Sequence, residues 1–203
     1  MDESCLVSSA QKTLEGIIAG DRKFKIPPLN PLILPLVEIF GPAMNVSLRN
    51  LSVDGLANSK IKSVKIDTAN KIGEVSWDVD KIILTGDYDL NGRILFLTLQ
   101  GADKANITVE KCNILWKFYY ELIEKKREKY GNITKFDTDF KVESATIQLN
   151  EIFRGNELLS KEHINVIIFD ELAIGIKAAI GAVFNMVTTG FFSKIPFDKL
   201  LKP

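Results

Sequence analysis

Residues 162–192 read EHINVIIFDELAIGIKAAIGAVFNMVTTGFF, and this stretch decides the fold. Its apolar side chains recur around every side of a helical wheel. A helix that is apolar all round has to be buried. If the stretch is helical throughout, it is about 45 Å long at roughly 1.5 Å per residue. The residues that precede it are therefore expected to form its cover.

Gly175, Gly181 and Gly190 interrupt the apolar run. Each glycine costs about 1 kcal/mol relative to alanine inside a helix. Because glycine has no side chain, we expect these positions to mark places where another element packs close to the helix backbone.

A transmembrane span is the alternative for this stretch, since such a span needs about 20 apolar residues with few charges. Asp170, Glu171 and Lys177 interrupt the run, and Lys194 follows it. These charges favour an internal helix covered by a sheet over a membrane span.

The composition predicts one globular domain, residues 1–203. A chain of this length buries about 70 % of its unfolded surface on folding, so it needs no cofactor for stability. Lys plus Arg total 26, as do Asp plus Glu. Nucleic-acid binding rests on an excess of Lys and Arg, so the charge balance argues against a nucleic-acid partner.

Cys5 and Cys112 are too few and too far apart for a disulfide scaffold or a zinc site. They bridge each other, pair outside the chain or stay reduced, and the sequence leaves these states open. The first five residues lack the basic start and apolar core of a secretory signal, so the protein is either cytosolic or has lost a signal.

Four Asn-x-Ser/Thr triplets, starting at Asn45, Asn50, Asn106 and Asn132, favour secretion. Such triplets are glycosylation acceptors only in the secretory pathway. Strands rich in Ser and Thr also produce them by accident, so the triplets alone leave both compartments open.

The amino-terminal part combines a helix with a proline-rich segment. Residues 4–20 predict a short amphipathic helix that stops at Gly20. Residues 26–36 contain four prolines, which exclude a helix and most pairing within a sheet. We expect this apolar segment to lie extended, as the lip of a cavity or the lid of a core.

From residue 43 onward, apolar and polar residues alternate as in the strands of an antiparallel meander. Asn91-Gly92 predicts a two-residue hairpin, with residues 94–99 as the returning strand. The alternation changes phase between Val109 and Cys112, which a β-bulge would explain.

The second half of the sheet is predicted from one long strand and its return. Residues 112–122 keep one apolar face, and the charged residues 124–129 predict an exposed hairpin tip. Residues 150–160 predict the corner that leads into the long helix. These elements predict an α+β fold, in which a strongly curved antiparallel sheet rolls around the long C-terminal helix, because a flat sheet would leave the helix half exposed.

Catalytic chemistry has little support in this sequence. His163 is the single histidine, and no Gly-x-Ser-x-Gly elbow, Walker loop, dinucleotide fingerprint or metal-ligand spacing is present. Cys112 shares an apolar strand face with Ile114 and Trp116, which predicts a buried, unreactive thiol. We therefore predict no enzyme, no catalytic residue, no metal and no cofactor.

A sheet of bulky residues curved about a helix rich in Gly and Ala predicts unfilled apolar volume, and small-molecule pockets are mostly apolar. Taken singly, each aromatic residue is better explained as part of a plain core. Tyr88, Tyr120, Thr138 and Asn185 are candidates for orienting a ligand. The candidate ligand-binding residues are Leu32, Leu36, Phe40, Trp77, Leu84, Tyr88, Leu97, Trp116, Phe118, Tyr120, Phe140, Phe153, Ile168, Leu172, Ile176, Ile180, Phe184 and Val187.

Seven short motifs follow one another along almost the whole chain. They are DESCL at 2–6, LNPL at 29–32, LRNLSVDGL at 48–56, LTGDY at 84–88, NGRIL at 91–95, LNEIFRGNEL at 149–158 and KIPFD at 194–198. In this order they resemble the insect takeout and juvenile-hormone-binding proteins, which belong to a wider superfamily with the lipid-binding bactericidal proteins.

The resemblance implies a secreted, non-enzymatic carrier with an elongated apolar tunnel between sheet and helix. It also implies a ligand such as a terpenoid hormone, a carotenoid, a quinone or a fatty acid. Two departures concern the cysteines. The family cysteine that precedes the one matching Cys5 has no counterpart here, and the terminal helix offers Cys112 no cysteine partner.

The sequence supports two functional hypotheses. The first is an extracellular carrier of a long hydrophobic small molecule. The second is a module for protein or membrane-surface interaction, in which residues 26–40 make transient contact with a receptor or a bilayer.

Overall fold

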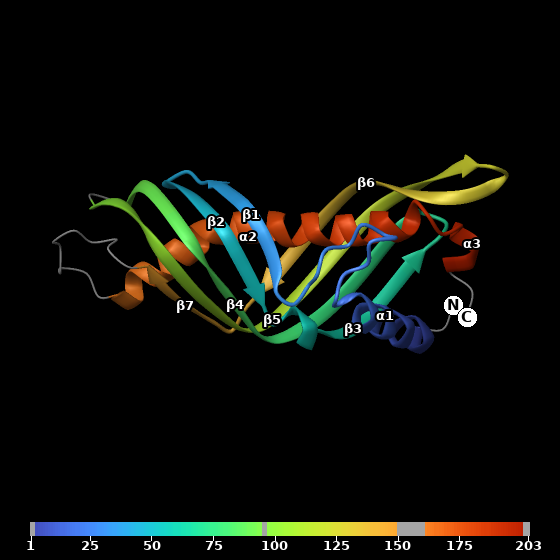
Figure 1. Cartoon of the computed structure of the whole chain (residues 1–203), viewed down its shortest axis with the longest axis horizontal. Helices are drawn as coiled ribbons and strands as arrows, with labels where there is room; N and C mark the ends of the chain where they lie inside the picture. The colour runs from blue at the N-terminus through green and yellow to red at the C-terminus, as the bar shows by residue number, and fades with distance from the viewer. Residues whose placement is uncertain (1–2, 95–96, 150–160, 201–203) are drawn as a thin grey trace.

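The protein's structure, a computed structural model, describes residues 3–94, 97–149 and 161–200, with the backbone alone at 94, 97, 161–168, 170, 171 and 174. Helix α2 runs along the length of the molecule, and the strands cross it obliquely (Figure 1). The elements are α1 (Glu3–Ile17), β1 (Leu32–Phe40), β2 (Met44–Asp54), η1 (Leu56–Asn58), β3 (Lys60–Asp67), β4 (Ile72–Ile94), β5 (Leu97–Lys125), β6 (Glu128–Lys141), β7 (Ser144–Leu149), α2 (Lys161–Phe192) and α3 (Phe197–Leu200).

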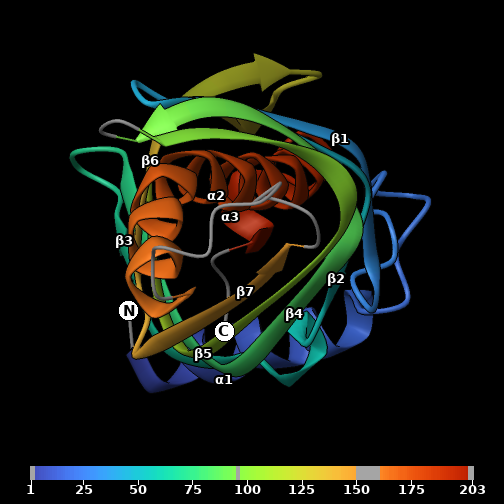
Figure 2. The ribbon, with the colours of Figure 1, turned by 90° about the vertical axis from the view of Figure 1, so that its left-hand side faces the viewer.

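The sheet is built on one long antiparallel ribbon of β4 and β5, which pair from Ile72 opposite Tyr119 to Ile94 opposite Leu97. Strands β2 and β3 pair with β4, strands β6 and β7 pair with β5, and β1 adds to β2. The described strands β1 and β6 do not pair, so the sheet does not close into a barrel. Figure 2 shows the strands curving around α2. The predicted fold class is confirmed.

The predicted phase change in β5 is present, but it involves no inserted residue. Glu110 and Lys111 are both exposed, and so are Asp80 and Lys81 on β4. The register of the two strands stays the same across this level, because both change phase at the same place. Lys111 takes a left-handed conformation, with φ of 49°. The ribbon thereby keeps an apolar face toward α2 on both halves of a twisted sheet.

The predicted turn at Asn91-Gly92 was wrong. Both residues lie inside β4 and pair with β2 on one side and β5 on the other. A Cβ atom at Gly92 would lie 2.4 Å from Cβ of Met44. This glycine therefore permits the close approach of a neighbouring strand and forms no turn. The connection from β4 to β5 falls at residues 95–96, outside the described part of the chain.

The prediction that proline would keep residues 26–36 out of the sheet was wrong for residues 32–36. These residues begin β1, which pairs with β2 on both sides of Pro35. Strand β1 is an edge strand, where a missing backbone N–H disrupts no ladder. The residue opposite Pro35 is Asn50, which has a positive φ of 50°.

Helix α2 confirms the predicted helix, and its three glycines mark close contacts as expected. A Cβ atom at Gly175 would lie 2.2 Å from Cγ1 of Ile39 on β1. A Cβ atom at Gly181 would lie 2.5 Å from Oγ1 of Thr138 on β6. A Cβ atom at Gly190 would lie 2.5 Å from the backbone oxygen of Phe24, in the segment that follows α1. The helix backbone therefore touches three separate parts of its cover.

Burial of α2 on all sides was predicted, and the structure shows partial cover. Leu172 is 2 % exposed, whereas Met186 is 37 % exposed, and Ala178 and Ala182 face solvent. Because β1 and β6 do not meet, one side of the helix stays open. By length and composition alone, Gly175–Phe192 also qualifies as a membrane span, and here it lies along the inner face of the sheet.

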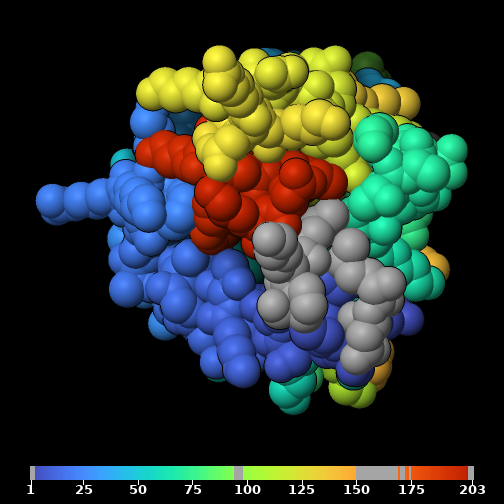
Figure 3. All heavy atoms as spheres, turned by 90° about the vertical axis from the view of Figure 1, so that its right-hand side faces the viewer, coloured from blue at the N-terminus to red at the C-terminus, as the bar shows by residue number. Residues whose placement is uncertain are grey.

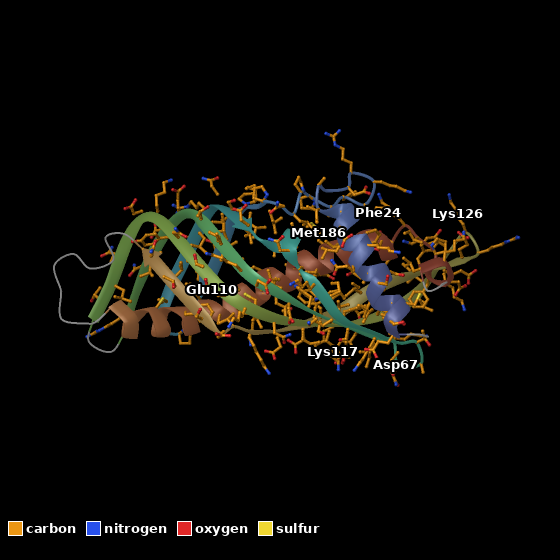
Figure 4. All side chains as sticks on the ribbon, turned by 90° about the horizontal axis from the view of Figure 1, so that it is seen from below. Phe24, Asp67, Glu110, Lys117, Lys126 and Met186 are labelled. Atoms are coloured by element: carbon orange, nitrogen blue, oxygen red, sulfur yellow. The ribbon has the colours of Figure 1, made fainter. Side chains whose placement is uncertain are left out.

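The two terminal helices lie toward one end of the molecule. Helix α1 packs beside β3, where the Gln11 side chain accepts a hydrogen bond of 2.9 Å from the Ile61 N–H. The end of α2 and helix α3 fill the space between the N-terminal segment and the β5–β6 hairpin (Figure 3). The tip of that hairpin is exposed as predicted, and Lys126 lies at this end (Figure 4).

Neighbouring residues on β5 provide a test of which face of the sheet is the core. Ile114 is 1 % exposed and Leu115 is 37 % exposed. We expect Ile114→Ala to lower the free energy of unfolding by about 2–5 kcal/mol, because it removes buried apolar atoms and leaves a larger empty space. Leu115→Ala should lower it by about 1 kcal/mol or less. Urea unfolding followed by circular dichroism measures both, and equal losses would contradict the assigned core face.

Candidate functional site

A cavity of about 70 Å³ lies between α2 and the inner face of the sheet. Its walls come from β1, β2, β4, β5, β6, η1 and α2, and every lining residue is apolar. The lining residues are Leu32, Leu34, Val37, Ile39, Leu48, Leu51, Val53, Leu56, Ile82, Leu84, Val109, Ile114, Phe140, Ile176, Ala179, Ile180, Val183 and Phe184.

The size of this cavity limits what it holds without rearrangement. An apolar protein cavity of about 150 Å³ binds benzene, and one water needs about 10–15 Å³. At about 70 Å³, the present cavity has room for part of a ligand only. A long apolar molecule therefore requires the wall side chains to move apart.

A surface groove of about 370 Å³ follows the line where β1 meets α2. Leu34 and Val37 on β1, together with Ala179 and Val183 on α2, line both this groove and the internal cavity. A single layer of side chains therefore separates the cavity from solvent. The α2 contribution to this layer includes Ala179, whose side chain is a single methyl group.

Phe184 lines the cavity, and aromatic rings fill the interior on the side of Phe184 that faces away from the cavity. The Phe184 ring lies 4.0 Å from that of Trp77, measured between centroids. The Trp116 ring stacks on that of Phe118, with 4.6 Å between centroids. The Tyr120 ring lies 5.1 Å from that of Phe197 on α3, also measured between centroids. The aromatic half of the interior is therefore packed, and the free space lies among aliphatic side chains.

Ten of the eighteen candidate ligand-binding residues lie in these two regions. Those that line the cavity are Leu32, Leu84, Phe140, Ile176, Ile180 and Phe184. Those in the packed aromatic region are Trp77, Trp116, Phe118 and Tyr120. Tyr88 and Leu172 are buried away from the cavity wall, and Val187 is half-buried against the core. Phe153 and the side chains of Leu97 and Ile168 lie outside the described residues.

Two of the candidates point away from the cavity. Leu36 is 52 % exposed and Phe40 is 74 % exposed. Strand β1 changes phase around its proline, so Val37 and Ile39 are the inward residues at this end. Leu36 and Phe40 therefore do not line the internal cavity, and Leu36 lines the outer groove instead.

Sequence reasoning missed twelve residues of the cavity wall, because it gave preference to large aromatic side chains. The period-two alternation was the available signal, since it marks most of them as one apolar face. The missed residues are Leu34, Val37, Ile39, Leu48, Leu51, Val53, Leu56, Ile82, Val109, Ile114, Ala179 and Val183.

Polar chemistry inside the sheet is sparse. Among the described residues, four buried side-chain atoms have no hydrogen-bond partner: Nε1 of Trp77, Nε1 of Trp116, the Tyr120 hydroxyl and Oγ1 of Thr138. The described charged pairs involve partly or largely exposed side chains. In one of them, Nζ of Lys117 lies 2.7 Å from Oε1 of Glu74. No group of the described residues is arranged to hold a metal ion.

The two cysteines are free in the structure. Cys112 is 1 % exposed, and burial raises the pKa of its thiol to about 11. The predicted burial of this thiol is confirmed, and a raised pKa makes the reactive thiolate scarce at neutral pH. Cys5 on α1 is half-buried.

Adjacent alanines on α2 allow a test of the cavity as the binding site. Ala179 lines the cavity and the groove, whereas Ala178 lines the groove alone. We expect Ala179→Phe to fill the cavity and weaken binding of the neutral fluorophore N-phenyl-1-naphthylamine at least about tenfold, a cost of about 1.4 kcal/mol. Ala178→Phe should bind as the unmodified protein does. Fluorescence titration measures both, with melting curves as a check of folding, and full binding by Ala179→Phe would place the site elsewhere.

Comparison with known proteins agrees with this architecture. The family model of the haemolymph juvenile hormone binding proteins matches residues 2–202. The circadian clock-controlled protein daywake of Drosophila yakuba is 24 % identical over 221 residues, which cover 99 % of this chain and 84 % of that protein. The crystal structure of Takeout 1 from Epiphyas postvittana has the same fold, with a TM-score of 0.84 at 21 % identity, over 98 % of this chain and 95 % of that one. The chain belongs to the haemolymph juvenile hormone binding protein family.

Proposed function

We propose that this protein is an extracellular, non-enzymatic carrier of a long hydrophobic small molecule, held between α2 and the sheet. The observation that carries this proposal is the cavity beneath α2, whose lining is entirely apolar. Family membership supports it, because the matching family model describes proteins that bind juvenile hormone. The proposed ligands are terpenoids such as juvenile hormone, carotenoids, quinones or fatty acids.

Ligand entry along the line between β1 and α2 would supply the missing volume. Moving the shared wall of Leu34, Val37, Ala179 and Val183 joins the cavity to the groove. Strand β1 is suited to this movement, because it pairs with the sheet along one edge only. Burying one CH₂ group contributes about 0.8 kcal/mol, whereas turning a wall side chain away from its rotamer costs about 0.5–1.5 kcal/mol. A ligand of ten carbons would therefore offset the movement of several side chains.

The positions of the glycosylation triplets support the extracellular part of this proposal. Asn45, Asn50, Asn106 and Asn132 are all exposed. Each is therefore accessible to a glycan on the outer face of the sheet, where the added sugar would not disturb the interior.

Extraction of the purified protein with organic solvent tests the carrier function. We expect mass spectrometry of the extract to reveal a hydrophobic molecule in an amount comparable to that of the protein. After extraction and refolding, the protein should take up a neutral terpenoid. A protein that carries no such molecule, and then binds neither terpenoid, quinone nor fatty acid, would rule the carrier function out.

A second candidate function is contact with a membrane surface or a receptor. The observation that favours it is the exposure of large apolar side chains on one edge: Ile33 is 53 % exposed, Leu36 52 % and Phe40 74 %. Exposed apolar patches of this kind often mark interaction sites. The edge adjoins the groove beside α2, so such contact would take place next to the proposed entry route.

Sedimentation with neutral phosphatidylcholine vesicles separates this second function from the first. We expect Phe40→Ser to reduce the vesicle-bound fraction severalfold, because it removes the most exposed aromatic ring of this edge. Binding of N-phenyl-1-naphthylamine should stay unchanged, since Phe40 does not line the cavity. If the unmodified protein does not sediment with vesicles, the membrane form of this candidate is excluded.

A further inference from the structure

One end of the molecule carries an excess of positive charge. Three segments meet there: residues 21–25 after α1, residues 124–129 at the tip of the β5–β6 hairpin, and residues 193–199 after α2 (Figure 3). Together they contain nine Lys and Arg side chains against four Asp and Glu, and all nine basic residues are exposed. The whole chain has no net charge, so this excess belongs to these three segments, which we call the basic end.

Direct contacts join the three segments into one surface. The Phe24 ring lies 4.6 Å from that of Phe191 near the end of α2, measured between centroids. Nζ of Lys199 on α3 lies 2.8 Å from Oε1 of Glu128 in the hairpin. Among the described residues, this is the one ion pair formed within the basic end, and the Asp21 carboxylate accepts backbone N–H groups of its own loop. Most of the positive charge is therefore not compensated locally.

The loops of the basic end place Lys and Arg where the backbone disfavours them. Lys126 and Arg127 form the two-residue turn of the hairpin, with φ of 53° and 64°. A turn with positive φ at both central positions prefers Asn-Gly. Lys25, in the loop after α1, also has a positive φ of 59°. Left-handed backbone is costly for long side chains and is kept mainly where the residue has a function. This cost indicates that the charges serve a purpose other than folding.

The side chains between these cations suit a lipid interface. Phe24, Phe191 and Tyr130 are half-buried among the basic residues, and Nζ of Lys23 lies 5.2 Å from the centre of the Phe24 ring. Aromatic rings and lysines both settle at the boundary between headgroups and acyl chains. An anionic bilayer attracts the Lys and Arg side chains and also accepts the rings. A polyanionic glycan supplies the charge alone.

We propose that the basic end docks on an anionic lipid bilayer, with the β5–β6 hairpin tip and the loop of residues 21–25 against the lipid headgroups. This contact differs from the one considered for Phe40, which uses apolar side chains of β1 and needs no anionic lipid. The docking goes beyond the carrier function and does not depend on what the cavity holds.

Sedimentation with vesicles of defined composition tests the docking. We expect the protein to bind vesicles of phosphatidylserine and phosphatidylcholine in equal parts at least about tenfold more tightly than vesicles of phosphatidylcholine alone, since each Lys or Arg near an anionic surface raises affinity about fivefold. Raising the salt from about 0.15 M to about 1 M shortens the screening length from about 8 Å to about 3 Å. This change should release the protein from the anionic vesicles.

The hairpin turn allows a variant that separates charge from structure. Lys126→Asn with Arg127→Gly removes two positive charges and introduces the residues that this turn prefers. We expect its affinity for the anionic vesicles to fall about 25-fold, at about fivefold for each charge. Its melting temperature should stay the same or rise. Its binding of N-phenyl-1-naphthylamine should not change, because neither residue lines the cavity.

Lys81→Gln with Lys111→Gln is the matched control. It also removes two exposed lysines, from the β4–β5 ribbon outside the basic end. Glu110, the neighbour of Lys111, lies far from Lys126 (Figure 4). Charges are screened beyond about 8 Å at physiological ionic strength, so the affinity of this control should stay within about twofold. Phe40→Ser should likewise leave binding to the anionic vesicles nearly unchanged.

Three results would overturn the docking, and each leaves the carrier function in place. The first is equal binding to neutral and anionic vesicles. The second is an equal loss of binding in the turn variant and in its matched control, because the basic end would then have no special role. The third is retention on immobilised heparin without binding to anionic vesicles, which would assign the basic end to a polyanionic glycan. Binding of N-phenyl-1-naphthylamine reports on the carrier function separately.

Discussion

The structure depends on how an apolar helix meets a sheet that cannot close around it. Helix α2 is too apolar to stand in water, yet β1 and β6 do not pair across it. Contact is made where glycine lets another element reach the helix backbone, as Ile39 does at Gly175 and Thr138 does at Gly181. Close contact at these points holds the helix near the sheet. Between them, small residues such as Ala179 leave volume that no sheet residue fills.

The interior consequently has two parts with different properties. Around Trp116 and Phe118, aromatic rings contact one another at centroid distances of 4.6 Å and more, and this part is packed. On the other side of Phe184, aliphatic side chains surround the cavity. Large flat rings fill space efficiently against one another, whereas branched aliphatic chains facing an alanine-rich helix leave gaps. The packed part supports the fold, and the part around the cavity is less completely filled.

The coordinated phase change in β4 and β5 allows one ribbon to serve both parts. A twisted sheet with strict alternation over more than twenty residues would turn its apolar face away from a straight helix. Two successive outward residues on each strand, Asp80-Lys81 and Glu110-Lys111, correct this at one level without changing the register. The left-handed conformation of Lys111 takes part in the correction.

Several features could be predicted from local pattern alone. The long helix, the alternating strands, the exposed hairpin tip and the buried thiol of Cys112 all follow from residues that are close in sequence. Helical and strand periodicity are local properties, so they survive without knowledge of the partner elements. The succession of short motifs likewise indicated the family.

Other features depended on which elements became neighbours. Asn91-Gly92 has the composition of a turn, yet it lies within β4 because the residue packed against Gly92 comes from β2. Phe40 has the character of a cavity residue, yet it faces solvent because β1 changes phase near Pro35. The position of the cavity depends on the combined volumes of side chains from seven elements. The sequence by itself determined which segments are helix or strand and which of their faces are apolar. Only the tertiary structure decided where those faces leave space, because unfilled volume belongs to no single segment.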